Sequence, residues 1–240
     1  MAADPHATSV GNSYADVGGR APTGTRDRLL AAAEHLFSER GFAATSMRAL
    51  TQAAGVSVSA ANYHFGSKFE LLRAVCERQL GPINDARLSA LDELDARCAP
   101  EAPEVEAVMH AFLRPAIVQE GTRKEDLREV ASRLYADPPE VVAELKQQLF
   151  GPVMRRVTES LVRSVPESSP ASVMLAFQMS VGAMVHVVAG HLDNVVGLPS
   201  PYPRDEELLD FMVAYCSGGF RASLAAADRS ESPVPPEGTR

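Results

Sequence analysis

Apolar residues recur at helical spacing through most of this chain. In the first such segment, from about Arg26 to Arg40, they follow one another at intervals of three and four residues, which places them on one side of a helix. This stripe consists of Leu29, Ala33, Leu36 and Phe37. Gly41 follows directly and is suited to end the helix. Similar patterns continue to about Ala227, so the predicted fold class is all-α.

Two short helices joined by a tight turn are predicted between residues 45 and 68. Thr45 and Ser46 both favour a helix N-cap, because a hydroxyl accepts the free amide bonds of a first turn. Gly55 can adopt the left-handed conformation that ends a helix. The second helix then covers Val58 to about Phe65. This order of elements predicts a helix-turn-helix unit.

The second of these helices has one apolar side and one side suited to DNA. At 3.6 residues per turn, the inward side consists of Val58, Ala61 and Phe65. The opposite side consists of Ser59, Ala60 and Tyr63, with Asn62 and His64 on its flanks. A helix whose outer side is small, polar and aromatic, without acidic charge, can enter a major groove. The spacing alone leaves an ordinary helical hairpin within a bundle as the alternative.

A longer helix is predicted to begin at Ser67, which forms a capping box with Glu70. Lys68 lies in its first turn, where a cation and the positive helix end can both face a phosphate. Gly81-Pro82 is expected to interrupt the helix, because proline lacks an amide donor and clashes with the preceding turn. A helix that leaves a DNA-binding head and kinks before the body would act as a lever. A plain packing kink is the alternative.

The segment from Thr25 to about Leu80 resembles the N-terminal domain of TetR-type transcriptional repressors. The resemblance rests on the order and spacing of short motifs. These are Leu36-Phe37, Gly41-Phe42, Thr45, Ala54-Gly55-Val56-Ser57, Tyr63-His64-Phe65, Ser67-Lys68 and Glu70-Leu71-Leu72. Asn62 stands where the family often has an aromatic residue. The run from Asn62 to Lys68 is similar to a subset of the family that includes fatty-acid and acyl-CoA responsive members.

This resemblance implies a homodimer that binds a palindromic DNA operator, most often as a repressor, and releases it when a small molecule binds. The residues expected to face DNA are Ser46, Arg48, Ser59, Ala60, Asn62, Tyr63, His64 and Lys68. Phosphate contacts are expected from Tyr63, His64 and Lys68, and the bases lie nearer Ser59, Ala60 and Asn62. In this family the last two helices commonly form a four-helix dimer interface; packing of the same faces within one chain is the alternative.

After a short proline-containing linker, further helices are predicted to form a C-terminal domain. They cover about Pro103 to Gln119, Glu125 to Tyr135, Pro138-Pro139 to Val165 with a kink at Gly151-Pro152, Pro170 to Val196 and Asp205 to Ala227. Soft and aromatic side chains on successive helices can line an adaptable cavity. The candidate ligand-binding residues are Met109, Phe112, Phe150, Met154, Met174, Phe177, Gln178 and Met184. The expected ligand is a small apolar molecule, with fatty acyl-CoA-like compounds among the candidates; a solid core is the alternative.

The net charge of −8 is not evenly distributed along the chain. Residues 25–80 carry seven Lys and Arg and five Asp and Glu, so the predicted head is weakly basic and the acidic excess lies elsewhere. DNA binding would therefore rest on a few placed contacts rather than on a broad positive field.

The three cysteines lack metal-type spacing, which favours packed thiols in a reduced, cytoplasmic protein. No uninterrupted apolar run reaches about 18 residues, so no membrane partner is predicted.

No motif indicates catalysis. His186 and His191 are five residues apart, which does not place two metal ligands on one helical face, and no phosphate loop, dinucleotide fingerprint or nucleophile elbow is present. We therefore predict a protein that is not an enzyme and needs no cofactor.

The predicted organisation is a disordered arm (1–24), a helix-turn-helix domain (25–72), a helical ligand-binding and dimerisation domain (73–227) and a disordered tail (228–240). A helical protein-interaction module and a regulator without a ligand remain as alternatives.

Overall fold

The computed structural model describes residues 24–119, 128, 139–195, 197 and 205–231, and every regular element in these ranges is a helix. They are α1 (Thr25–Ala44), α2 (Met47–Ala54), α3 (Val58–Phe65), α4 (Lys68–Cys98), α5 (Val105–Ile117), α7 (Pro139–Ser164), α8 (Pro170–Val188), the 3-10 turn η1 (His191–Asn194) and α9 (Glu206–Glu231). The prediction of an all-α fold is confirmed. Of the helix predicted from Glu125 to Tyr135, only Arg128 is among the described residues, and residues 1–23 of the predicted arm lie outside them.

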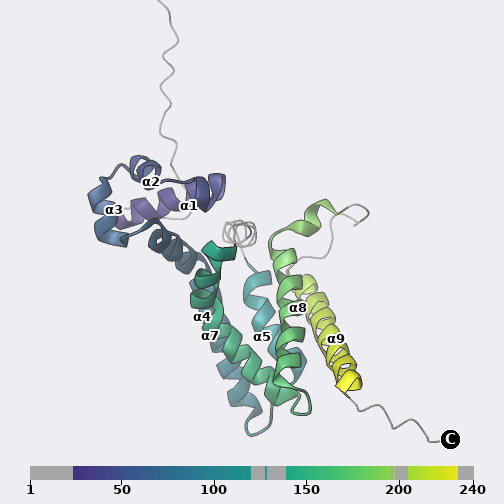
Figure 1. Ribbon diagram of the computed structural model, residues 1–240. Helices are drawn as coiled ribbons and strands as arrows, with labels where there is room; N and C mark the ends of the chain where they lie inside the picture. The colour runs from purple at the N-terminus through teal and green to yellow at the C-terminus, as the bar shows by residue number, and fades with distance from the viewer. Residues whose placement is uncertain (1–23, 120–127, 129–138, 196, 198–204, 232–240) are drawn as a thin grey trace, which may run out of the picture.

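The chain is divided into a small head and a larger body, joined by α4. Figure 1 shows α1, α2 and α3 gathered at one end of α4, and α5, α7, α8 and α9 beside its other end. We call α1–α3 with the start of α4 the head, and the rest of α4 with α5, α7, α8 and α9 the body. The helix pair α8 and α9 lies at the edge of the body that is farthest from α4 (Figure 1).

The head is held together by buried leucines, among them Leu29, which the sequence spacing placed on the inward side of its helix. Leu29, Leu50 and Leu71, from α1, α2 and α4, are fully buried, and α1 packs against both α2 and α4. Gly41 has a φ of 79°, a conformation that glycine adopts without steric cost, and it breaks the regular helix where the sequence predicted an end. One further turn follows to Ala44 before the chain enters the helix-turn-helix.

The expected interruption of α4 at Gly81-Pro82 is wrong. α4 runs as one helix of 31 residues with Pro82 inside it. Proline removes one amide donor and so frees the carbonyl four residues earlier, at Arg78. Arg78 and Pro82 are both exposed, so the freed carbonyl lies on the solvent side of the helix, where water can bind it. In the same way, α7 continues through Gly151-Pro152.

The last two helices differ from their predicted bounds. α8 ends at Val188 rather than near Val196, because Gly190 turns the chain with a φ of 77° into the short helix η1. α9 continues to Glu231, so the first residues of the predicted tail are still helical.

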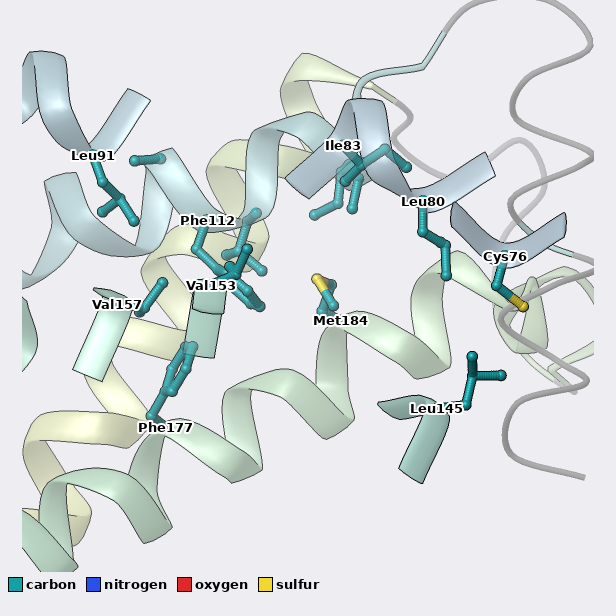
Figure 2. Packing of buried hydrophobic residues seen from close by; sticks show 14 of the residues in the cluster. Cys76, Leu80, Ile83, Leu91, Phe112, Leu145, Val153, Val157, Phe177 and Met184 are labelled. Carbon is teal, nitrogen blue, oxygen red and sulfur yellow. The ribbon is translucent and has the colours of Figure 1, made fainter. Parts of the chain in front are cut away.

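The interior of the body is formed by aromatic and sulfur-containing side chains from α5 and α8. Phe112 and Phe177 are buried and meet edge to face, with ring centroids 5.0 Å apart. In Figure 2, Phe112, Phe177 and Met184 project into the same interior between the helices. Buried residues of α4 and α7, among them Leu91 and Val157, complete this core.

A group of ion pairs fixes α7 against α4 at the end away from the head. Arg156 donates to Asp92 at 3.0 Å and to Asp95 at 2.7 Å, and Arg163 donates to Asp95 at 2.5 Å. The side chain of Asp95 is about one quarter exposed, so these bonds are partly shielded from water. They hold two helices together that lie more than sixty residues apart in sequence.

Candidate functional site

The helix-turn-helix of the head is built by local capping. The hydroxyl of Ser46 accepts the amide of Ala49 at 3.1 Å at the start of α2, and Ser57 caps α3 in the same way through the amide of Ala60. Gly55 has the left-handed φ of 63° that was predicted for the turn between the two helices. These three positions fix the start of both short helices and the end of α2.

Thr45 has a different role from the predicted cap. Its side chain is buried, and its hydroxyl donates to the carbonyl of Gly41 at 2.8 Å. It therefore ties the last turn of α1 to the start of the helix-turn-helix, and only Ser46 caps α2. A buried hydrogen bond of this kind contributes about 1 kcal/mol to stability.

The outward face of α3 is polar and aromatic, as the sequence predicted. Ser59, Asn62 and His64 are exposed, and Tyr63 is 86% exposed, with its ring edge to face against that of His64. A tyrosine ring left this open to water has no role in the core of the protomer. Of the remaining candidates in this helix, Ala60 is half-buried.

The inward face of α3 is narrower than predicted. Ala61 and Phe65 are buried, but Val58 is 47% exposed. Val58 is the first residue of a helix of eight residues, so its side chain lies beyond the edge of the core. α3 therefore presents an apolar contact at its N-terminal end in addition to the polar groups along its outer side.

The remaining DNA-facing candidates belong to the start of α2 and the start of α4. Ser46 and Arg48 are exposed at the N-terminal end of α2, which packs against α3. Lys68 is half-buried and has partners within the head: its ammonium donates to the carbonyls of Phe42 and Thr45, both at 2.8 Å, and lies 4.2 Å from the ring centroid of Phe42.

Lys68 is thus a structural tie between α4 and the end of α1. Sequence analysis missed this role, because the two carbonyls lie more than twenty residues away along the chain. An ammonium group has three N–H donors, so one remains for the predicted phosphate contact. That contact stays a prediction.

The candidate ligand residues of the body fall into three groups. Met109, Phe112, Phe177 and Met184 are buried, and Phe150 and Met154 of α7 are half-buried. Met174 and Gln178 are exposed, so the prediction that they line the same interior is wrong for this protomer. They are four residues apart, so they lie one above the other on an exposed side of α8.

Two polar residues in the body were not singled out from the sequence. Asn84 and Arg87 lie one turn apart on α4, and both side chains are buried. The guanidinium of Arg87 donates to the carbonyl of Phe112 at 2.9 Å, to the side chain of Asn84 at 3.2 Å and to the sulfur of Met184 at 3.1 Å. Burial lowers the pKa of Arg87 to about 10. The available signal was a polar pair at helical spacing within an apolar stripe.

The outer face of α8 and α9 is apolar and uncovered. Large apolar side chains that are each more than half exposed lie on these two packed helices; they are Met174, Leu175 and Met179 of α8 and Phe211 and Tyr215 of α9. We call these five residues the α8–α9 face. Apolar clusters of this kind mark interaction sites.

By length and composition alone, α8 could also cross a membrane, with a mean hydropathy of 1.7 over its most apolar window, although polar residues such as Gln178 interrupt it. Its inner side packs on α5, α7 and α9, as a bundle helix does.

In the described part of the chain, no group of three or more His, Cys, Asp or Glu side chains could hold a metal ion. Cys76, Cys98 and Cys216 form no disulfide with one another, and Cys76 and Cys216 are buried.

Known proteins resemble both parts of this chain. Residues 29–75 match the model described as bacterial regulatory proteins, tetR family, and residues 110–219 match that described as tetracyclin repressor-like, C-terminal domain. The HTH-type transcriptional regulator BetI of Rhizobium meliloti (strain 1021) is 32% identical over 116 residues, which cover 43% of this chain and 55% of BetI. The match thus spans about half the length of that relative.

Solved structures share the fold at low sequence identity. A putative transcriptional regulator from Pseudomonas aeruginosa PAO1 has a TM-score of 0.60 at 16% identity, over 85% of this chain and 92% of that chain. The fatty acid degradation regulator FadR from Bacillus halodurans has a TM-score of 0.59 at 18% identity, over 80% and 98%. The family models cover the helix-turn-helix and most of the body, and the solved regulators share the arrangement of both. This chain belongs to the TetR family of DNA-binding transcriptional regulators.

Proposed function

We propose that this regulator is a cytoplasmic homodimer that binds a palindromic operator as a repressor and leaves it when a small apolar molecule enters the body. The observation that carries the proposal is the α8–α9 face. Five large apolar side chains, each more than half exposed, lie on two neighbouring helices. A second copy of the same face would cover them and form a four-helix interface.

A two-fold dimer explains why a weakly basic head is sufficient for binding. Two copies of α3 would lie about one DNA turn apart, roughly 34 Å or a multiple of it, on a site with matching symmetry. Each head then contributes a few contacts through residues such as Tyr63, Asn62 and Arg48, which are all exposed. The two sets of contacts act together, so neither head needs a broad positive field.

The interior of the body supports the response to a small molecule. Phe112, Phe177 and Met184 come from two helices and meet in one apolar region, which Phe150 and Met154 of α7 border as half-buried side chains. A ligand that binds there can shift the equilibrium between two arrangements of the dimer only by its difference in affinity for them.

The closely packed pair of Phe112 and Phe177 supports a second candidate, a dimeric regulator that has a solid core and responds to no ligand. Their ring centroids are 5.0 Å apart, at the distance expected for direct contact. In that case DNA binding depends on protein concentration alone.

Operator binding by the full-length protein tests the proposal. Palindromic segments from the promoter region of its own gene are titrated in parallel with random DNA, and the stoichiometry is determined by sedimentation. We expect one dimer per site, an affinity at least about 10³-fold above that for random DNA, and weaker binding at higher salt. Equal, weak binding to genomic fragments and random DNA would contradict the operator, and a monomer at micromolar concentration would contradict the dimer. Release of the complex by compounds from an apolar library separates the ligand-responsive candidate from the solid core.

A further inference from the structure

Arg87 is a cation enclosed in the body. Its side chain is 3% exposed, and its guanidinium carbon lies 4.3 Å from the ring centroid of Phe112. Although burial lowers its pKa to about 10, Arg87 carries a full charge at neutral pH. Enclosing a charge in an apolar interior is costly unless an opposite charge accompanies it.

The bonds that Arg87 makes do not neutralise its charge. Its acceptors are a backbone carbonyl, the side-chain oxygen of Asn84 and the thioether of Met184, which are all neutral groups. Among the described residues, no carboxylate forms an ion pair with Arg87. By contrast, Arg156 in the same body contacts two aspartates. Arg87 therefore differs from a structural arginine that a local acid holds in place.

The bond to Met184 is the weakest of the three. A thioether sulfur is a poor acceptor, and a methionine side chain changes conformation easily. A guanidinium has five N–H donors, of which Arg87 uses three, so one donor remains on each terminal nitrogen. A carboxylate or phosphate in place of the sulfur would accept two parallel bonds from these nitrogens.

We propose that Arg87 binds the anionic group of the effector, and that the effector is a small amphipathic anion. Its carboxylate or phosphate takes the place of the Met184 sulfur on the terminal nitrogens of Arg87. Its apolar part lies among the aromatic side chains of α5 and α8, beginning with Phe112 and Phe177. This inference rests on the proposed ligand response of the body and specifies the chemical class of its ligand.

The position of Arg87 also connects such a ligand to the head. Asn84 and Arg87 bind carbonyls of α7 and α5, those of Leu149 and Phe112, at 2.9 Å each. Each of these carbonyls lies three residues before a proline inside its helix, next to the carbonyl that the proline leaves without its helical donor. The polar pair therefore joins α4 to α5, α7 and α8 at one point. An anion that alters the bonds of Arg87 acts on the helix that carries the head.

The experiment compares anions with neutral molecules of the same length. Full-length protein bound to its operator is titrated with straight-chain carboxylates and alkyl phosphates, from butyl to hexadecyl, and with the corresponding primary alcohols. The variants are Arg87→Met, which removes the charge and keeps the apolar stem, and Arg87→Lys, which keeps the charge and loses the paired donors. Arg114→Met is the control, because it removes an exposed cation from α5 that pairs with Glu206 on the surface.

At least one anion is expected to release the wild-type complex at a concentration where the matched alcohol does not. For that anion, the concentration needed for half release should rise roughly tenfold or more in Arg87→Met, rise less in Arg87→Lys and stay unchanged in Arg114→Met. Comparison of carboxylates with phosphates identifies the head group. Operator affinity without ligand shows that each variant is folded; if Arg87→Met does not fold, Arg87→Lys carries the comparison.

The assignment is overturned if an anion acts equally on wild type and on both Arg87 variants, or if alcohols act as well as anions on the wild type. When alcohols release wild type and Arg87→Met alike, the proposed ligand response stands and only the role of Arg87 fails. When none of these compounds releases the wild type, Arg87 has no anionic effector and the inference fails. Release by a compound of another class would then keep the ligand response itself.

Discussion

The head and the body arrange polar and apolar side chains in opposite ways. The head keeps its leucines inside and presents Asn62, Tyr63 and His64 to water, as expected for a surface that meets DNA. The body exposes Met179 and Phe211 and encloses the charged Arg87. The head thus presents a polar surface outward, whereas the body has apolar side chains outside and a charge inside. In the proposed dimer, a second copy would cover the exposed apolar side chains of the body, and the proposed ligand would accompany the charge of Arg87.

The largest expected effect comes from a charge in the α8–α9 face. Leu175→Glu should split the dimer, because the interface would enclose an unpaired carboxylate. Operator affinity should then fall at least about 100-fold, or about 3 kcal/mol. Sedimentation and a DNA titration on the same sample measure both effects. Gln147→Glu adds the same charge at an exposed position of α7 and should change neither. A dimeric Leu175→Glu protein with normal affinity would show that the exposed apolar side chains have another purpose.

Lys68→Met separates a structural role in the head from a DNA contact. Loss of two charge-assisted bonds to Phe42 and Thr45 should destabilise the head by about 2 kcal/mol, measured by urea unfolding. Arg48→Met removes an exposed cation from α2 and should weaken DNA binding without this loss of stability. If Lys68→Met unfolds like wild type and only the salt dependence of DNA binding changes, Lys68 acts at a phosphate as the sequence predicted.

Tyr63→Ala tests the outward face of α3. Operator binding should weaken roughly tenfold, about 1.4 kcal/mol, because each protomer loses a side chain that is almost fully open to a partner. The unfolding free energy and the dimer should not change. Tyr63→Phe keeps the ring and shows how much of the effect belongs to the hydroxyl group. Unchanged binding at matched salt would remove Tyr63 from the DNA surface.

The smallest expected effect concerns the ion pairs between α4 and α7. Burial alone would raise the pKa of Asp95, but hydrogen bonds from Arg163 and Arg156 outweigh it and lower this pKa below its usual value. Such a group stabilises the fold above its unfolded pKa of about 3.9, and this contribution is lost as the pH falls through the lower folded value. Asp95→Asn should therefore cost about 1 kcal/mol at neutral pH, and less below about pH 4. A difference that does not depend on pH would contradict this origin.

The helices of the head could be predicted from the sequence because their ends are determined locally. Ser46, Gly55 and Ser67 act within three residues of their own positions, so the spacing of caps and apolar side chains was sufficient. The break at Pro82 was predicted wrongly, because the prediction considered only the local effect of proline. Proline has a known local cost, but whether the chain tolerates it depends on which side of the helix faces water.

The parts of the site that sequence reasoning missed depend on contacts between distant segments. Lys68 binds carbonyls at the other end of the head, and Arg87 meets Met184 almost one hundred residues away. Met174 and Gln178 were assigned to the interior because periodicity separates the faces of an apolar helix but does not say which face the protomer buries. For α8, the face left outside is nearly as apolar as the face inside.

The continuous course of α4 has a mechanical consequence for the proposed response. The twenty residues from Lys68 to Arg87 form a rod roughly 28 Å long at the usual helical rise. A tilt of about 5° around Arg87 would displace the head end of such a rod by roughly 2.5 Å. Because α4 is continuous through Pro82, the amplification would come from its length. A small rearrangement in the interior would then reach the DNA without a change in conformation at any residue between them.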